Sequence, residues 1–358
     1  MNTFGHIFRL TSFGESHGAA MGGVIDGVPA NVPVDADALQ QFVNRRHPEP
    51  HTGGTARREY DVVEVLSGIY EGRTLGTPIG FIVRNHDVRS GDYDHLRDAY
   101  RPSHADYTYQ MKYGIRDHRG GGRASARETV TRMVAGALAT QMLQHLGVHV
   151  QAFVECVGKA GCRLNPEELD IPGNAESSHF NPTQAGAKAI RQEIAKAQKL
   201  GDTLGGTILC VARGVPAGWG EPVAAKLHAD LGAAMLSINA VKAFEIGQGH
   251  QFSSLYGSEV QDLMKPDANG RICFAANHSG GVQGGISNGN DICFRLVVKP
   301  VPTLMRETPV VNSSGEAVAI TPQGRHDVTA VVRAVPIVEA MTAMVLLDHY
   351  LMSKTNHL

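Results

Sequence analysis

Apolar residues fall along this chain in short runs at strand spacing and in longer runs at helical spacing. The runs MGGVI, VVEV, GFIV, VHVQAFVECV, ILCVA and DICFRLVV are short, rich in β-branched residues and bounded by glycine, proline or polar residues. Each of these runs predicts a strand. Residues 5–34 therefore predict two strands joined around the turn GESHG.

Five longer stretches carry the spacing of helices. Asp35 is a predicted N-cap for the first of them, and the last is a long helix with a kink near Pro336 and Asp327 as its N-cap. The five predicted helices cover residues 36–46, 127–146, 185–200, 223–236 and 325–352.

The second half of the chain repeats features of the first half in the same order. GDTLGGTILCVARGVPA at 201–217 aligns without a gap with GESHGAAMGGVIDGVPA at 14–30, and a predicted helix follows each. GISNG at 285–289 then corresponds to GIYEG at 68–72. GRHD at 324–327 comes at the start of the last predicted helix, as GRAS at 122–125 comes just before the predicted helix at 127–146. Chance matches in a glycine-rich chain are the alternative, but four in one order favour duplication. We therefore predict an α+β fold, a single domain over 1–358 with two β-α-β halves at about 1–150 and 185–358.

Composition narrows the possible functions. The 358 residues suffice for one large domain or two, and a net charge of −2 makes the arginine clusters local features. Nucleic acid is not an expected partner, because its binders carry a basic excess over a whole face. Five cysteines without a C-x-x-C pair predict reduced thiols and no metal site. With no apolar signal core and no membrane-length run, a soluble cytoplasmic protein is expected.

The densest candidate chemistry lies at residues 101–129, RPSHADYTYQMKYGIRDHRGGGRASARET. Three glycines before a predicted helix start let the backbone approach a ligand, and the helix start offers unpaired N–H groups to an anion. Arg123 and Arg127 add guanidinium groups suited to phosphate or carboxylate. A basic surface loop is the alternative, but His104 just upstream favours an anion-binding active site.

Three other motifs qualify this interpretation. Ser16 and His17 lie between two glycines in a predicted strand connection, which gives a ligand room beside the imidazole. The loop at 45–60 is either a solvated loop or a lid that brings Arg57 and Arg58 to an anionic substrate. GGVQGG resembles a phosphate loop but lacks the lysine of a P-loop and the strand–loop–helix setting of a dinucleotide site.

With these motifs in place, the chain resembles the chorismate synthase family. GESHGAAMGGVIDGVP, the stretch at 101–129 and GRHDVTAVVRAVPIVEAM carry the resemblance, and SINAVKAFEIG, NHSGGVQGGISNG and VVKPVPT fit it too. The resemblance implies a lyase that converts 5-enolpyruvylshikimate 3-phosphate to chorismate and phosphate by 1,4-elimination, with reduced FMN and no net redox change. It also implies long central helices between two antiparallel sheets, and a homotetramer.

The resemblance further implies roles for individual residues. His17 matches a histidine that donates a proton toward the departing phosphate, and His104 matches one that protonates the reduced flavin near N1. Asp327, with Ser16 and Ser125, matches the group that works with flavin N5 to remove the C6 proton. The residues that match FMN contacts are Arg123, Ala124, Ser125, Asn239, Ala240, Gly284, Lys299, Pro300, Val301, Pro302, Thr303 and Arg325. For the phosphate and carboxylates of the substrate we select Arg46, Arg101, Arg127 and Arg325.

Some positions depart from the family pattern. Relatives often have a basic residue in the loop where this chain has Glu49 and His51, so we expect an external system, not NADPH bound to this chain, to reduce the FMN. Ala124 replaces a serine of some relatives, while Ser125 keeps its hydroxyl. A flavin oxidoreductase and a non-catalytic binder of a phosphorylated ligand remain the rival interpretations.

Overall fold

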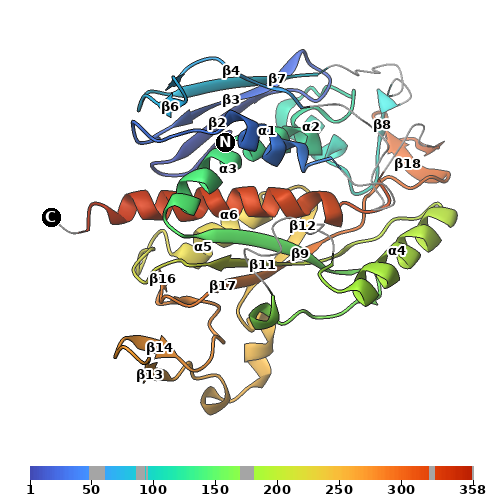
Figure 1. Ribbon diagram of the computed structural model, residues 1–358. Helices are drawn as coiled ribbons and strands as arrows, with labels where there is room; N and C mark the ends of the chain where they lie inside the picture. The colour runs from blue at the N-terminus through green and yellow to red at the C-terminus, as the bar shows by residue number, and fades with distance from the viewer. Residues whose placement is uncertain (48–60, 86–92, 94–95, 170–180, 322–326, 357–358) are drawn as a thin grey trace.

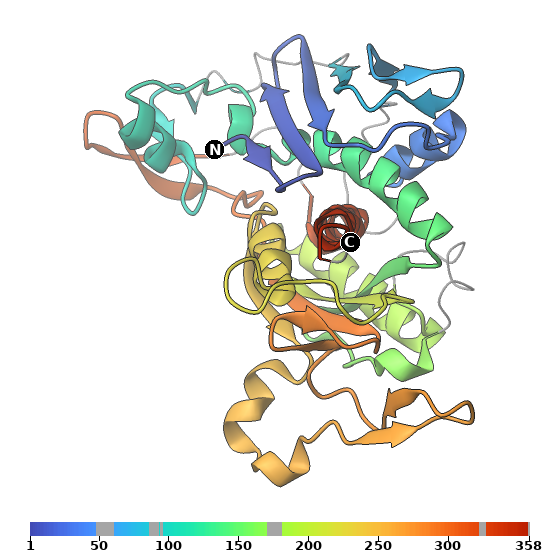
Figure 2. The ribbon, with the colours of Figure 1, turned by 90° about the vertical axis from the view of Figure 1, so that its left-hand side faces the viewer.

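Two antiparallel five-stranded sheets lie on either side of a layer of helices (Figures 1 and 2). The structure, a computed structural model, describes residues 1–47, 61–85, 93, 96–169, 181–321 and 327–356. The first sheet contains, in spatial order, β1 (Thr3–Phe4), β2 (Arg9–Gly14), β3 (Ala20–Asp26), β7 (Ile79–Arg84) and β4 (Val63–Val65). The second contains β10 (Ala160–Gly161), β9 (His149–Val157), β11 (Gly206–Arg213), β17 (Ile292–Val298) and β12 (Val241–Ile246).

The helical layer is built around α3 (Thr129–His145) and α6 (Val331–Ser353), which pack against each other between the sheets. Nearly every residue of α6 from Val331 to His349 is buried, as expected for a helix that is apolar on all sides. The helices α1 (Ala36–Asn44) and α5 (Leu227–Leu236) pack on α3 and α6, respectively. This layer and the inner faces of both sheets form one hydrophobic core.

The helix α4 (Gln184–Lys199) packs on β9 and β10 and adds Ile190 and Ile194 to the same core. The other elements are smaller. They are α2 (Asp106–Tyr113), a sheet of β8 (Ala99–Tyr100), β18 (Thr308–Asn312) and β19 (Ala317–Ile320), and the hairpins β5 (Ile69–Tyr70) with β6 (Arg73–Thr74), β13 (Met264–Pro266) with β14 (Ile272–Phe274), and β15 (Val282–Gln283) with β16 (Ile286–Ser287). The residues of the β13–β14 hairpin are mostly exposed.

The predicted strands correspond to β2, β3, β4, β7, β9, β11 and β17. The prediction of the α+β class is also correct. Asp35 is the N-cap of α1, since its side chain accepts a hydrogen bond from the Ala38 amide. The prediction of Asp327 as an N-cap is wrong, because α6 begins at Val331 with Ala330 as its cap. The Asp327 carboxylate instead accepts a hydrogen bond of 2.7 Å from Arg333 Nη1. The start of α5 is also four residues later than expected, after Ala225 with a φ of +55°.

All five cysteines are free thiols, and Cys210 and Cys293 are buried. Within the described ranges, no helix combines the length and the apolar composition that crossing a membrane requires.

Gly136 sets the distance between the two central helices. A Cβ at this position would lie 2.3 Å from the Cβ and 2.5 Å from the Cα of Ala340. We expect Gly136→Ala to lower the free energy of unfolding by about 3 kcal/mol, because overpacking forces α3 and α6 apart. Denaturant unfolding measures the change. Gly257→Ala is the control, since nothing lies within 4 Å of its added methyl group, and an equal loss in both variants would contradict the close approach of the helices.

Candidate active site

A cavity of about 580 Å³ lies where residues from both halves of the chain meet. The first half contributes the end of α1, the turn before α2 and the segment before α3, and the second half contributes two connections next to β12 and β17 and the start of α6. The lining residues are Arg46, His47, Tyr93, Arg101, Ser103, His104, Ala105, Gly120, Ala124, Ser125, Ala126, Arg127, Thr129, Ile238, Asn239, Ala240, Lys242, Lys299, Val301, Pro302, Thr303, Asp327, Ala330, Arg333, Ala334 and Ile337.

Charge is distributed unevenly in this lining. It contains six arginine and lysine side chains but one carboxylate, that of Asp327, among the described residues. A concave site with one dominant sign of charge concentrates ligands of the opposite sign. The cavity therefore suits a ligand with several negative charges.

The glycine turn brings a histidine to the edge of the cavity. Gly120, Gly121 and Gly122 have φ values of +62°, +89° and +53°, a left-handed backbone that favours glycine. At Gly120 a Cβ would lie only 2.1 Å from His17 Cε1. The His17 ring also meets Tyr93 edge to face at 5.0 Å between centroids. Because Gly120 and Tyr93 line the cavity, His17 lies directly behind its rim.

We expect Gly120→Ala to slow turnover about 10²-fold, since an ångström of displacement of a reacting group has that effect. The added methyl group would push the His17 ring out of place. Steady-state kinetics of the reaction that the resemblance implies measures the change. Gly114→Ala is the matched control, because Gly114 has a similar φ of +72° but open space around its Cβ position. Equal rates in the two variants would show that strain in the backbone, and not His17, determines the effect.

A buried carboxylate, Asp61, holds two of the cavity arginines. Asp61 is 0% exposed, and its Oδ2 accepts hydrogen bonds from Arg46 Nε at 3.0 Å and Arg46 Nη2 at 2.6 Å. Its Oδ1 accepts a short hydrogen bond from Arg127 Nη1. Burial alone would raise the pKa of Asp61, but the charges of Arg46 and Arg127 outweigh burial and lower it. Asp61 is therefore a carboxylate that fixes both guanidinium groups.

His47 lines the cavity next to this network, with its Nε2 at 3.7 Å from Asp61 Oδ2. Burial, followed by the charges of Arg46 and two further arginines, lowers the pKa of His47 below its ordinary value, although Asp61 acts in the opposite direction. Burial also lowers the pKa of Arg46 to about 10. His47 is therefore a neutral imidazole at pH 7.

A second buried carboxylate, Asp106, holds Arg101 and His104. Its oxygens accept hydrogen bonds from Arg101 Nε and Nη2, both at 2.8 Å, and from His104 Nδ1 at 2.9 Å. Lys299, from the other half of the chain, donates a hydrogen bond of 2.8 Å to the carbonyl of Ser103, whose φ is +58°. The turn that carries Arg101 and His104 is thus fixed from both sides.

The remaining wall contains a buried polar atom without a partner among the described residues. Asn239 donates from Nδ2 to the Ala124 carbonyl at 3.1 Å, while its buried Oδ1 has no hydrogen-bond partner within the described part of the chain. Next to it, Ala240 has a φ of +69°. An unsatisfied buried acceptor among apolar groups such as Ile238 and Val301 is typical of a cofactor site that polar groups orient.

Comparison with known proteins decides the family. A family model described as chorismate synthase matches residues 8–351. The chorismate synthase of Bacteroides thetaiotaomicron is 52% identical over 357 residues, which cover 100% of this chain and 99% of that protein. The enzyme of Parabacteroides distasonis is 53% identical over 355 residues, 99% of each chain. A crystal structure of a chorismate synthase matches 97% of this chain and 93% of that chain, with a TM-score of 0.77 and 29% sequence identity.

The chain belongs to the chorismate synthase family. It is therefore a lyase of the shikimate pathway that converts 5-enolpyruvylshikimate 3-phosphate to chorismate and phosphate, the last step toward the precursor of the aromatic amino acids. This substrate carries one phosphate and two carboxylates, which agrees with the excess of positive charge in the cavity.

The structure brings most of the residues selected from the chorismate synthase motifs to this cavity. They are His104, Ser125, Asp327, Arg46, Arg101, Arg127, Ala124, Asn239, Ala240, Lys299, Val301, Pro302 and Thr303. Ser16 does not line the cavity, but its Oγ lies 3.2 Å from His17 Nδ1. Pro300 does not line it either, although its neighbours on both sides do.

Two more of the selected residues, Arg123 and Gly284, do not line the cavity. The Arg123 guanidinium turns toward β2 and donates to Ser12 Oγ at 2.7 Å. Gly284 lies in the turn between β15 and β16. Arg325 lies outside the described residues, as do Glu49, His51 and the proposed lid residues Arg57 and Arg58.

The chorismate synthase motifs alone missed several residues of the site. Asp106 could have been found, because it follows His104 by two residues within the same motif. Asp61 could not, since its arginine partners lie 15 and 66 residues away in the sequence. His47, Lys242 and Arg333 also line the cavity without having been selected. In the described part of the chain, no cluster of three or more His, Cys, Asp or Glu side chains is arranged to hold a metal ion.

Proposed function

We propose that this cavity is the place where the substrate and reduced FMN meet and the elimination occurs. The observation that carries the proposal is that one concave site contains an excess of arginine and lysine side chains together with His104 and Asp327. At about 580 Å³ the cavity has the size of typical small-molecule and cofactor sites.

Residues from the second half would hold FMN. The Asn239 Oδ1 acceptor, the apolar edge formed by Val301 and Pro302, and the Lys299 ammonium group support this assignment. From the first half, Ala124 and Ser125 would contact the same cofactor. When bound, reduced FMN lends electron density to the reacting ring, so that phosphate leaves without net oxidation of the cofactor.

Arg46, Arg101 and Arg127 would bind the phosphate and the carboxylates of the substrate. Guanidinium groups match these anions with paired hydrogen bonds, and the buried carboxylates Asp61 and Asp106 hold them in place before binding. Binding the substrate in a fixed orientation lowers the entropic part of the barrier.

Side chains of this protein would carry out the two proton transfers that the reaction requires. His17, oriented through Ser16, would deliver a proton to an oxygen of the departing phosphate. Asp327, helped by the Ser16 and Ser125 hydroxyl groups, would receive the proton that the ring carbon loses. His104 would present its Nε2 to the bound ligands, because Asp106 engages its Nδ1. The proton lost by the ring balances the proton gained by phosphate.

An anaerobic assay tests the proposal. Substrate is mixed with chemically reduced FMN in catalytic amount, and phosphate release and the flavin spectrum are followed together. We expect many phosphates per flavin and a flavin that ends reduced. Stoichiometric oxidation of the flavin would favour a flavin oxidoreductase, and no phosphate release at all would favour a protein that only binds a phosphorylated ligand.

We further propose a duplicated fold. The spatial order β2-β3-β7-β4 in one sheet parallels β9-β11-β17-β12 in the other. The middle strand of each sheet, β3 or β11, is followed in sequence by the residues GVPA. The next helix is α1 in the first half and α5 in the second. The long helices α3 and α6 would be the second pair of equivalents.

We also propose a cytoplasmic homotetramer that depends on an external system to reduce its FMN, as expected from the resemblance. Light scattering of the purified protein checks the tetramer. Incubating the protein with NADPH and oxidised FMN alone checks the source of electrons, since no reduction of the flavin is expected.

A further inference from the structure

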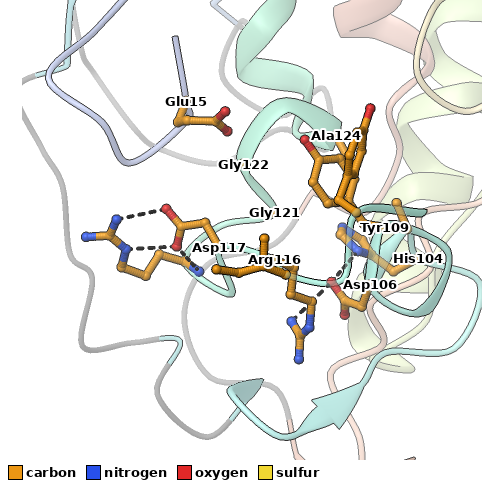
Figure 3. A pocket seen from close by; sticks show the side chains of 13 residues that line it. Glu15, His104, Asp106, Tyr109, Arg116, Asp117, Gly121, Gly122 and Ala124 are labelled. Atoms are coloured by element: carbon orange, nitrogen blue, oxygen red, sulfur yellow. Dashed lines mark hydrogen bonds and ion pairs between the residues drawn. The ribbon is translucent and has the colours of Figure 1, made fainter. Parts of the chain in front are cut away.

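His104 lies in the wall between two cavities. Besides the cavity described above, it lines a second one of about 470 Å³, and the two also share Ala105 and Ala124 (Figure 3). Gly121, which has no side chain, faces the ring, and a Cβ there would lie 3.1 Å from His104 Cε1. With space on two sides and glycine beside it, the imidazole requires a specific contact to keep one orientation.

Asp106 provides that contact. Its side chain is buried, and a hydrogen bond joins it to the His104 ring in Figure 3. Oδ2 accepts hydrogen bonds from the backbone N–H of Arg101 at 3.0 Å and from Arg101 Nε at 2.8 Å. Oδ1 accepts from Arg101 Nη2 at 2.8 Å and from His104 Nδ1 at 2.9 Å. Each oxygen therefore receives two hydrogen bonds, which fills the capacity of a carboxylate.

The charge state of Asp106 decides where the proton of His104 lies. Burial alone would raise the pKa of Asp106, but the hydrogen bonds from Arg101 and His104 outweigh burial and hold it well below the ordinary range. An ionised carboxylate can only accept hydrogen bonds. The His104 Nδ1 must then carry the proton, and its Nε2 is left for a partner other than Asp106.

We propose that Asp106 is a positioning residue for the reaction, because one carboxylate fixes both the Nδ1-protonated form of His104 and the guanidinium group of Arg101. This inference rests on the proposed function, which places His104 and Arg101 at the catalytic cavity. This shared carboxylate keeps the His104 imidazole, which holds a proton, at a constant position relative to the Arg101 guanidinium group, which binds an anion. Asp106 itself does not line the larger cavity among its described residues.

Asparagine cannot replace aspartate here. With its NH₂ group at the Oδ2 position, it would face the N–H and Nε–H donors of Arg101. With its NH₂ group at the Oδ1 position, it would face Arg101 Nη2 and His104 Nδ1. Either orientation sets donor against donor. In the second orientation, the imidazole can relieve the conflict by moving its proton from Nδ1 to Nε2.

The test combines a spectroscopic and a kinetic measurement. In full-length protein with ¹⁵N-labelled histidine rings, the His104 resonances are assigned by their loss in His104→Gln. At a pH where the ring is neutral, the wild type is expected to have Nδ1 protonated and Nε2 unprotonated. Asp106→Asn is expected to change this pattern and to lower kcat about 10²-fold, while the far-UV circular dichroism spectrum stays the same.

A double variant shows whether Asp106 acts through His104. In the His104→Gln background, Asp106→Asn is expected to lower kcat by much less than in the wild-type background, because coupled residues are not additive. The loss that remains is the part that Asp106 contributes through Arg101. Asp117→Asn is the control, since Asp117 lines the same second cavity and pairs with Arg119, but no hydrogen bond or ion pair within the described ranges joins it to His104. Its kcat and His104 resonances are expected to match the wild type.

Three results would overturn the inference: an Nε2-protonated ring in the wild type, unchanged resonances and kcat in Asp106→Asn, or fully additive effects in the double variant. The first needs no substitution at Asp106, so an Asp106 variant that fails to fold does not remove the test. Failure of the proposed function would appear separately, as a wild-type protein that releases no phosphate.

Discussion

Removing the carboxylate of Asp61 is expected to lower the free energy of unfolding by about 3–5 kcal/mol, the range for a buried ion pair that loses one partner. In Asp61→Ala, the fully buried Arg46 would keep its charge without its hydrogen-bond acceptor, and Arg127 would lose its carboxylate as well. Denaturant unfolding at pH 7 measures the loss. A loss below about 1 kcal/mol would contradict the role that we assign to Asp61.

The exposed pair of Arg84 and Glu64 provides the matched control. Its carboxylate accepts from Arg84 Nε at 2.7 Å, but the two side chains are 55% and 39% exposed. Exposed pairs contribute about 0–1 kcal/mol, so Glu64→Gln is expected to have little effect. Comparing the losses of stability in Asp61→Ala and Glu64→Gln shows how much of the effect depends on burial of the ion pair.

The effect of Asp61 should also depend on pH in a defined direction. Because folding lowers the pKa of Asp61, its contribution to stability is complete above the pKa of the unfolded state, about 3.9, and is lost as the pH falls through the lower pKa of the folded state. The difference in stability between wild type and Asp61→Ala that comes from this carboxylate should therefore shrink as the pH falls below about 4. A difference that grows below about pH 4 would contradict this assignment.

Replacing His17 or Asp327 by alanine is expected to slow phosphate release by about 10²–10⁴-fold, the usual contribution of a positioned acid or base. His17 lies behind the rim of the cavity next to Gly120, and Asp327 lines it beside Arg333. Rapid measurement of phosphate under anaerobic conditions gives kcat, and circular dichroism verifies that the fold survives. If either variant turned over at the wild-type rate, that residue would lose its proposed role.

His145 on α3 serves as the control for this pair of variants, since it is exposed near the end of the helix and does not line the cavity. His145→Ala is expected to leave kcat within twofold of the wild type. A comparable loss in this variant would mean that the assay responds to general destabilisation.

Local sequence patterns predict the strands and the long helices, because strand and helix periodicities are properties of neighbouring residues. Predicted element ends are less accurate where a tertiary contact competes with a local one. Asp327 precedes an apolar run and resembles a cap, but its carboxylate pairs with Arg333 and the helix begins only at Val331. The helix α2 was missed, since its residues alternate polar and aromatic side chains without an apolar face.

For the site, motifs identify groups that contact ligands better than groups that support them. His104 and Ser125 were found within a dense motif, and the cavity contains both. Asp61 supports Arg46 and Arg127 from a distant segment, so no short pattern contains all three. Arg123, also selected from a motif, does not line the cavity, and its guanidinium group bonds to β2.

The most direct measurement of the central claim is a crystal structure of the chain with substrate and reduced FMN. Phosphate and carboxylate oxygens of the substrate should lie at about 2.7–3.2 Å from nitrogens of Arg46, Arg101 and Arg127, with a flavin donor group at Asn239 Oδ1. Both ligands bound outside this cavity, or arginines that keep only their carboxylate partners and never touch the substrate, would contradict the account.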